Sequence, residues 1–168
     1  MNITSAKWTS PEQTTIEAVI DGVTMFVPND MGNTHRQAIT VIDDYVAPPI
    51  TSNQVNQERD SRISAGFTFS GKVYDFDSKS KDNISGAALN AFMAIVAGTQ
   101  AGNLRWHGGS TDFAWIAQDN TLTTMDAQTV VAFGQAAAAH ETAHIFAART
   151  LKESDPIPTD YTDDVYWP

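Results

Sequence analysis

The chain has 168 residues, 42% of them hydrophobic, which is enough for the core of one ordinary domain or of two very small ones. It contains no cysteine, and this excludes a disulfide framework, a thiolate nucleophile and cysteine metal ligands. The formal net charge of −10 repels phosphate backbones, and no apolar run approaches the ~20 residues that cross a bilayer, so we expect neither a nucleic-acid nor a membrane partner.

Residues 1–46 predict a small N-terminal module of a β-hairpin and a helix. Strands are expected over residues 3–8, 15–20 and 23–27, where β-branched and aromatic side chains are frequent. Asp21-Gly22 lies between the second and third of these runs, which is a strong hairpin signal. A helix is expected from Thr34 to Tyr45, because Ile39 and Ile42 recur at helical spacing.

A proline-rich linker is predicted over residues 47–55, because Pro48-Pro49 cannot continue a helix. A second block, residues 56–153, follows the linker. We expect a polar helix over 56–64 and a hairpin of aromatic residues between Phe67 and Phe76. A second helix should begin at Asn83 or Ser85 and end before Gly98, with apolar residues at helical spacing.

The rest of the second block predicts short strands and one long helix. Strands are expected over 104–106, 113–116 and 121–125, followed by an alanine-rich helix from Ala127 to Leu151 with Asp126 as its N-cap. Residues 154–168 should form an extended, acidic tail that packs only through its aromatic side chains. The fold class is therefore α+β, with small antiparallel sheets packed against helices and a long C-terminal Ala-rich helix.

The second block resembles the phage family catalogued as the DUF4376 domain. The resemblance covers residues 56–153 and is carried by Arg62, Gly66-Phe-Thr-Phe-Ser-Gly71, Asp75-Phe-Asp77, Ile84-Ser-Gly-Ala-Ala88, Trp115-Ile-Ala-Gln-Asp-Asn120, Met125-Asp-Ala127 and the helix from Ala139 to Lys152. It implies a phage origin and a place in the tail or tail fibre. It implies no known catalytic residues.

The first block resembles the leader of many phage tail-fibre-associated proteins. The matching residues are Trp8, Ile20-Asp-Gly22, Val27-Pro-Asn-Asp30 and Asn33-Thr-His35. Two blocks in the order expected of such proteins strengthen the phage interpretation.

One string in the chain has the form of a catalytic motif. His140-Glu-Thr-Ala-His144 fits H-E-x-x-H on a predicted helix, where one turn would place two zinc ligands on the same face with Glu141 as the general base. The third ligand is missing, because a metzincin would carry a glycine and a histidine where this chain has Ala147 and Thr150. We therefore favour a structural helix and expect no metal, no cofactor and no catalytic residue.

The tryptophans suggest where the chain buries or exposes aromatic surface. Trp106 and Trp115 are expected in the core, whereas Trp167, with Tyr166 and Tyr161, is predicted to bind a partner. The leading functional hypothesis is a non-enzymatic structural protein of the virion tail, made in the host cytoplasm, associated with the tail fibre and host adsorption.

Its expected partners are other phage tail or tail-fibre proteins, together with further copies of itself in a homo-oligomer. One alternative is a tail-fibre assembly chaperone that is absent from the virion. The other is a zinc metallopeptidase that uses His140, Glu141 and His144.

Overall fold

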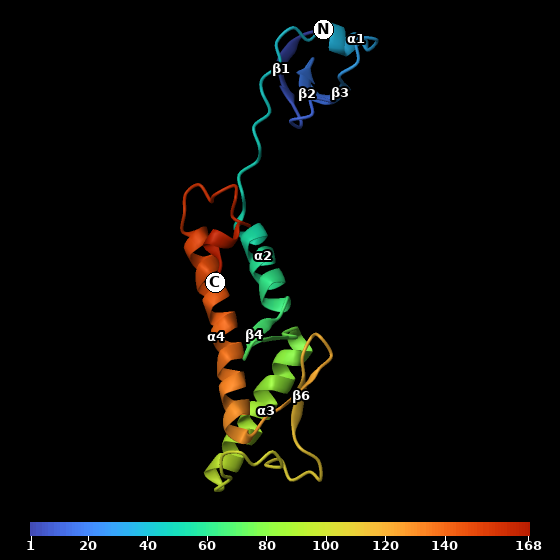
Figure 1. Ribbon diagram of the computed structural model, residues 1–168. Coiled ribbons are helices and arrows are strands. Elements are labelled where there is room, and N and C mark those ends of the chain that lie inside the picture. The colour runs from blue at the N-terminus through green and yellow to red at the C-terminus, as the bar shows by residue number, and fades with distance from the viewer. The chain divides into compact units, whose positions relative to one another are not determined.

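The computed structural model describes all residues 1–168 and divides them into two compact units, Met1–Pro49 and Ile50–Pro168. Each unit has its own hydrophobic core. The predicted α+β class is confirmed, since small antiparallel sheets occur together with helices and the longest helix is C-terminal (Figure 1). No helix of the chain has both the length and the apolar character of a membrane span.

The first unit is a three-stranded antiparallel sheet with one short helix. Its strands β1 (Ile3–Trp8), β2 (Thr15–Ile20) and β3 (Val23–Pro28) lie in the order β1-β2-β3, and α1 (Thr34–Ala38) follows. Asp21 and Gly22 both have positive φ, 48° and 82°, which is the geometry of a tight hairpin turn. The three predicted strands are therefore confirmed, and the Asp-Gly signal marked their connection correctly.

The helix predicted from Thr34 to Tyr45 is wrong beyond Ala38. Ile39 is 4% exposed and packs into the core of the sheet, and its backbone is extended. Further on, Asp43 pairs with β1, because its N–H donates to the Ala6 carbonyl at 2.8 Å and its carbonyl accepts from the Trp8 N–H at 3.1 Å. These contacts with β1 take the place of helical hydrogen bonds.

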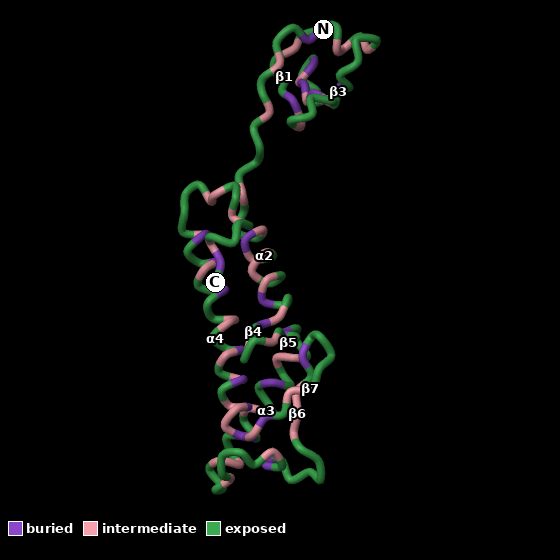
Figure 2. The backbone as a smooth tube through the Cα atoms, viewed as in Figure 1, coloured by how far each residue is buried: buried purple, intermediate pink, exposed green.

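The second unit contains three long helices and two hairpins. The helices are α2 (Ser52–Ser64), α3 (Ser78–Val96) and α4 (Ala127–Lys152), and the hairpins pair β4 (Phe67–Phe69) with β5 (Lys72–Tyr74) and β6 (Ala114–Ile116) with β7 (Leu122–Thr124). Figure 1 shows α4 running beside α2 along one part of its length and beside α3 along another. Buried residues recur along α4 on the side that faces these elements (Figure 2).

Helix starts in the second unit follow from their caps. Asp126 caps α4 by accepting from the Thr129 N–H at 2.8 Å, so the predicted start of this helix is confirmed. The predicted starts of the other two helices are several residues too late. Asp77 caps α3, and Thr51 forms a capping box with Gln54 before α2. The linker therefore ends where α2 begins, and not at residue 55.

Aromatic side chains form the centre of the second core. Phe133 of α4 lies 5.0 Å from Phe67 and 4.8 Å from Tyr74, measured between ring centroids. Trp106 and Trp115 belong to this core as predicted, Trp106 at 9% exposure and Trp115 partly buried. Residues 104–106 form turns, so the strand predicted there is wrong. The indole Nε1 of Trp106 instead donates to the Met125 carbonyl at 3.1 Å.

Residues 154–168 are not an extended tail. They turn back onto α2 and α4 and include η1 (Asp164–Tyr166), a single turn of 3-10 helix. Arg62 of α2 holds this segment by donating to the carboxylate of Asp164 at 2.9 Å and to the Thr162 carbonyl at 2.6 Å. The predicted boundary at 153 is therefore not a domain boundary.

Candidate interaction face and histidine cluster

Helices α3 and α4 cross at a glycine. An ideal Cβ built on Gly134 of α4 would lie only 2.6 Å from the Cβ of Ala88 on α3, so the two backbones approach as closely as these residues allow. Toward one end of the pair, the Lys81 ammonium on α3 lies 2.6 Å from the Glu141 carboxylate on α4. Since Lys81 precedes Ala88 and Glu141 follows Gly134, the two helices are antiparallel.

This crossing fixes which residues share a side of the helix pair. In an antiparallel pair, a residue a given number of positions after Ala88 on α3 lies on the same side of the pair as the residue the same number of positions after Gly134 on α4. The same holds for residues before these two positions. The core side contains Ile84 with Val130 and Ala91 with Ala137, all four of which are buried. Positions on the opposite side are exposed, and we call this surface the outer face. The outer face includes Leu89, Phe92 and Val96 of α3 and Gln135, Ala138 and Thr142 of α4.

Between Ser85 and Val96 the outer face is apolar and carries no formal charge, and the exposed Asp82, seven residues before Leu89, lies at its edge. Leu89, Phe92 and Val96 are 62%, 52% and 67% exposed, and the neighbouring Met93 is 58% exposed. The solvent side of a surface helix is ordinarily charged and polar. Here no charged residue occurs between Asp82 and Arg105, a stretch that includes most of α3. An exposed apolar surface of this kind is a candidate interaction site.

The charge of α4 supports the same conclusion. Between Ala127 and Ala148 the only formally charged residue is Glu141, and its carboxylate is paired with Lys81. The helical spacing of apolar residues predicts α3 itself, but the outer face was not predicted from it. The available signal was the width of the apolar arc, which exceeds the ~100° that a helix with one buried side needs.

The histidines of the H-E-x-x-H string do lie together. The ring centroids of His140 and His144 are 4.4 Å apart, as expected for residues one helical turn apart. The His144 Nδ1 donates to the His140 carbonyl at 2.8 Å, while the buried Nε2 of His140 has no hydrogen-bond partner. Burial, followed by the neighbouring His144, lowers the pKa of His140.

The remaining parts of a zinc centre do not come together at these histidines. Glu141 pairs with Lys81 on α3, although a peptidase would use it as a base beside the metal. No group of three or more histidine, cysteine, aspartate or glutamate side chains has the arrangement of a metal site. A catalytic zinc needs three protein ligands, so the residues present do not fit one.

The aromatic residues predicted to bind a partner instead fill a site within their own unit. Trp167 is 7% exposed and packs in a cluster with α2 and α4, and Tyr161 and Tyr166 are partly buried against the same cluster. The Trp167 Nε1 donates to the Tyr161 carbonyl at 2.8 Å, and the Trp167 ring stacks against His144. The ring of Trp167 is therefore buried and holds the C-terminal segment in place, and its binding to a partner stays a prediction.

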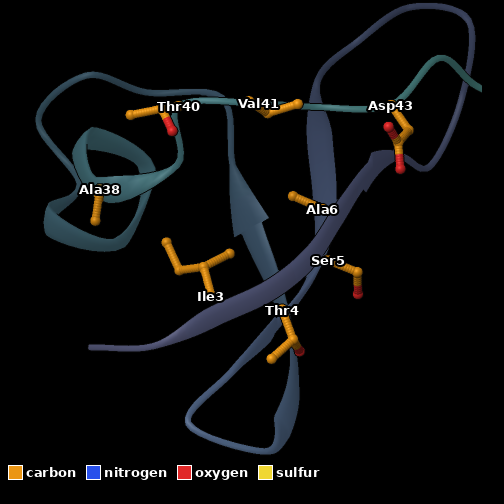
Figure 3. A pocket seen from close by; sticks show the side chains of 8 residues that line it. All are labelled: Ile3, Thr4, Ser5, Ala6, Ala38, Thr40, Val41 and Asp43. Atoms are coloured by element: carbon orange, nitrogen blue, oxygen red, sulfur yellow. The ribbon is translucent and has the colours of Figure 1, made fainter.

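Two surface pockets offer little chemistry. In the first unit, the side chains around a pocket of about 360 Å³ come from β1 and from the segment that passes opposite it (Figure 3), and Asp43 is the one ionisable residue among them. In the second unit, a pocket of about 600 Å³ lies between α3 and the loop that contains Trp106 and His107.

Comparison with known proteins gives one match. The family model described as "Domain of unknown function (DUF4376)" matches residues 47–165. No curated protein and no solved structure matches the chain. The matched region begins in the predicted linker and ends within the C-terminal segment, so it is longer than the resemblance over residues 56–153.

Proposed function

Because the chain belongs to the DUF4376 family, whose model matches more than half of it, we propose that it is a structural protein of a bacteriophage tail, associated with the tail fibre and the host-adsorption apparatus. In this role it works without catalysis and is located in the tail of the virion. Its partners are other tail or tail-fibre proteins.

The observation that carries this proposal is the outer face of α3 and α4. A protein that acts by binding other proteins needs an exposed surface with apolar side chains and few charges. Leu89, Phe92 and Val96 supply such a surface and are held on helices, which present them in a fixed arrangement. Proteins that build a large assembly act through such faces rather than through enclosed pockets.

The two-unit organisation supports the same role. Each unit has its own core, and residues 46–49 between them are exposed. A chain of this kind can bind one component through its first unit and another through its second. The resemblance of the first unit to the leader of tail-fibre-associated proteins favours fibre or tail components as those partners.

The first test is mass spectrometry of purified particles of the phage that encodes the chain. Peptides of this chain in stoichiometric amounts relative to known tail proteins would support the proposal. Their absence would refute a place in the virion and would favour the alternative of a tail-fibre assembly chaperone. A chaperone would instead co-purify with newly made fibre subunits from infected cells.

The second alternative, a zinc metallopeptidase, is tested by the metal content of the recombinant protein. The observation in its favour is the close approach of His140 and His144 on one face of α4. One zinc per chain, lost in His140→Ala or His144→Ala, together with peptidase activity lost in Glu141→Gln, would support it. A metal-free chain, even after incubation with equimolar Zn²⁺, would refute it.

A further inference from the structure

We infer that the outer face binds a second copy of this chain, so that α3 of each copy packs against α4 of the other. This inference rests on the proposal that the outer face is a protein-binding surface, and it names the occupant. The arguments come from charge, from area and from the shapes of the two helices.

The distribution of charge favours a second copy at this face. Two copies with a formal net charge of −10 each repel one another wherever their charged surfaces approach. Between Ser85 and Val96 the outer face carries no formal charge, so two copies can meet over this part of α3 and leave Asp82 at the edge of the contact. Leu89, Phe92 and Val96 then gain the free energy of leaving water.

The area of the face suits a small homodimer. The part of α3 after Asp82 is about 21 Å long, and two packed helices present a surface roughly 20 Å wide, which gives about 420 Å² before side-chain relief is counted. Helix α4 is longer, with 26 residues, and extends this surface. A stable interface takes about 800 Å² from each partner, so this part of the outer face supplies about half of the area and the neighbouring surface of α4 must supply the rest.

The two helices also have complementary shapes. On α3 the outer face consists of large apolar side chains that protrude, whereas opposite them on α4 it has the small side chains of Ala138 and Thr142, with the 59% exposed Phe146 one turn further on. A two-fold axis parallel to the helices places α3 of each copy over α4 of the other. The large side chains of α3 then lie over the small side chains of Ala138 and Thr142 in the partner. The same surface then serves both partners, as a two-fold interface requires.

The test is the molar mass of the full chain in solution, measured by light scattering after size exclusion at about 100 μM. A mass near twice 18.2 kDa is expected for the wild type. Leu89→Glu places a charge in the interface and should raise the dimer dissociation constant on the order of 100-fold. Gln135→Glu changes an exposed polar residue of α4, so it should fold normally and raise the same constant about tenfold.

The matched control is Leu122→Glu, which makes the same substitution at a residue of similar exposure, 69% against 62% for Leu89, in the hairpin of β6 and β7. Its dissociation constant should stay within about twofold of the wild type. Dissociation by Leu122→Glu with no effect of Leu89→Glu or Gln135→Glu would overturn the inference, because the interface would then lie on the hairpin.

A monomeric wild type would also overturn the inference of a second copy. If Leu89→Glu then lowered the free energy of unfolding, another part of the same chain would cover the outer face. The particle experiment is independent of these outcomes. A monomer found in virions would refute the second copy alone, and a dimer absent from virions would refute the tail location alone.

Discussion

The guanidinium carbon of Arg62 lies 5.2 Å from the centroid of the Trp167 ring, which joins α2 to the next-to-last residue of the chain. The same guanidinium binds Asp164 and the Thr162 carbonyl, and Trp167 in turn packs against α4. A short C-terminal segment therefore contributes to the core between two helices that are far from it in sequence.

Trp167→Ala should destabilise the second unit by about 3 kcal/mol, because it leaves a cavity between α2 and α4 and removes the cation–π contact with Arg62. Chemical denaturation followed by the helical circular dichroism signal measures this loss. The signal comes mainly from the second unit, because the first unit has a single helix of five residues, α1. Val165→Ala is the control. Val165 is 82% exposed in the same segment, so its loss should change stability by less than ~0.5 kcal/mol.

Gly134→Ala should destabilise the chain by about 1–2 kcal/mol, although alanine is the better helix former. The added Cβ would meet the Cβ of Ala88 at 2.6 Å and force α3 and α4 apart. Gly86→Ala on α3 is the matched control, because a Cβ there meets nothing within 4 Å and should stabilise the helix by roughly 0.5–1 kcal/mol.

A double substitution checks the steric explanation of the Gly134 effect. Ala88→Gly combined with Gly134→Ala removes the clash and should recover most of the lost stability, apart from the weaker helix propensity at position 88. Equal destabilisation with and without Ala88→Gly would show that the contact between these two residues is not the cause.

His140 should make the chain less stable in mild acid. Burial and the neighbouring His144 lower its pKa from the ordinary value of 6.5, so the unfolded chain takes up the proton more readily than the folded one. The stability present above pH 6.5 is therefore lost as the pH falls below this value toward the pKa of the folded state. His140→Gln should flatten the dependence of unfolding free energy on pH between 7 and 5, and an unchanged slope would contradict this origin.

Asp126→Ala should cost about 1–2 kcal/mol, because Asp126 caps α4 and its carboxylate also accepts from the Gly102 N–H at 2.7 Å. Hydrogen bonds from Thr129 and Gly102 lower the pKa of Asp126 from its ordinary value of 3.8. The ionised carboxylate therefore contributes to the free energy of unfolding above pH 3.8, and this contribution is lost as the pH falls through the lower pKa of the folded state. Asp126→Asn keeps a capping side chain and should recover part of the loss. Denaturation of the three proteins at pH 7 measures the difference.

Several elements of this protein could be predicted from the sequence because local interactions determine them. The turn at Asp21-Gly22 needs residues that accept positive φ, and the start of α4 needs a side chain such as that of Asp126 to accept from the first turn. The strands of the first unit have the residue types that a sheet prefers. In each case the cause lies within a few residues of the effect.

The candidate site could be predicted only in part. The sequence placed His140 and His144 on one helical face, and this is confirmed, because helical spacing is local. It could not show that Glu141 pairs with Lys81, 60 residues away, or that the ring of Trp167 is buried against α4. Both contacts depend on how distant segments pack.

Residue patterns along the chain are enough to predict the α+β class, the hairpins of the first unit and the extent of α4. Contacts between distant segments are the reason that Ile39 packs into the sheet and that the C-terminal segment folds back, and they leave Leu89, Phe92 and Val96 exposed. The apolar arc of α3 offers two possible sides for burial. The spacing of apolar residues shows that either side of this arc could be buried. The close packing of α4 on α3 at Gly134 and Ala88 selects the side that becomes the core.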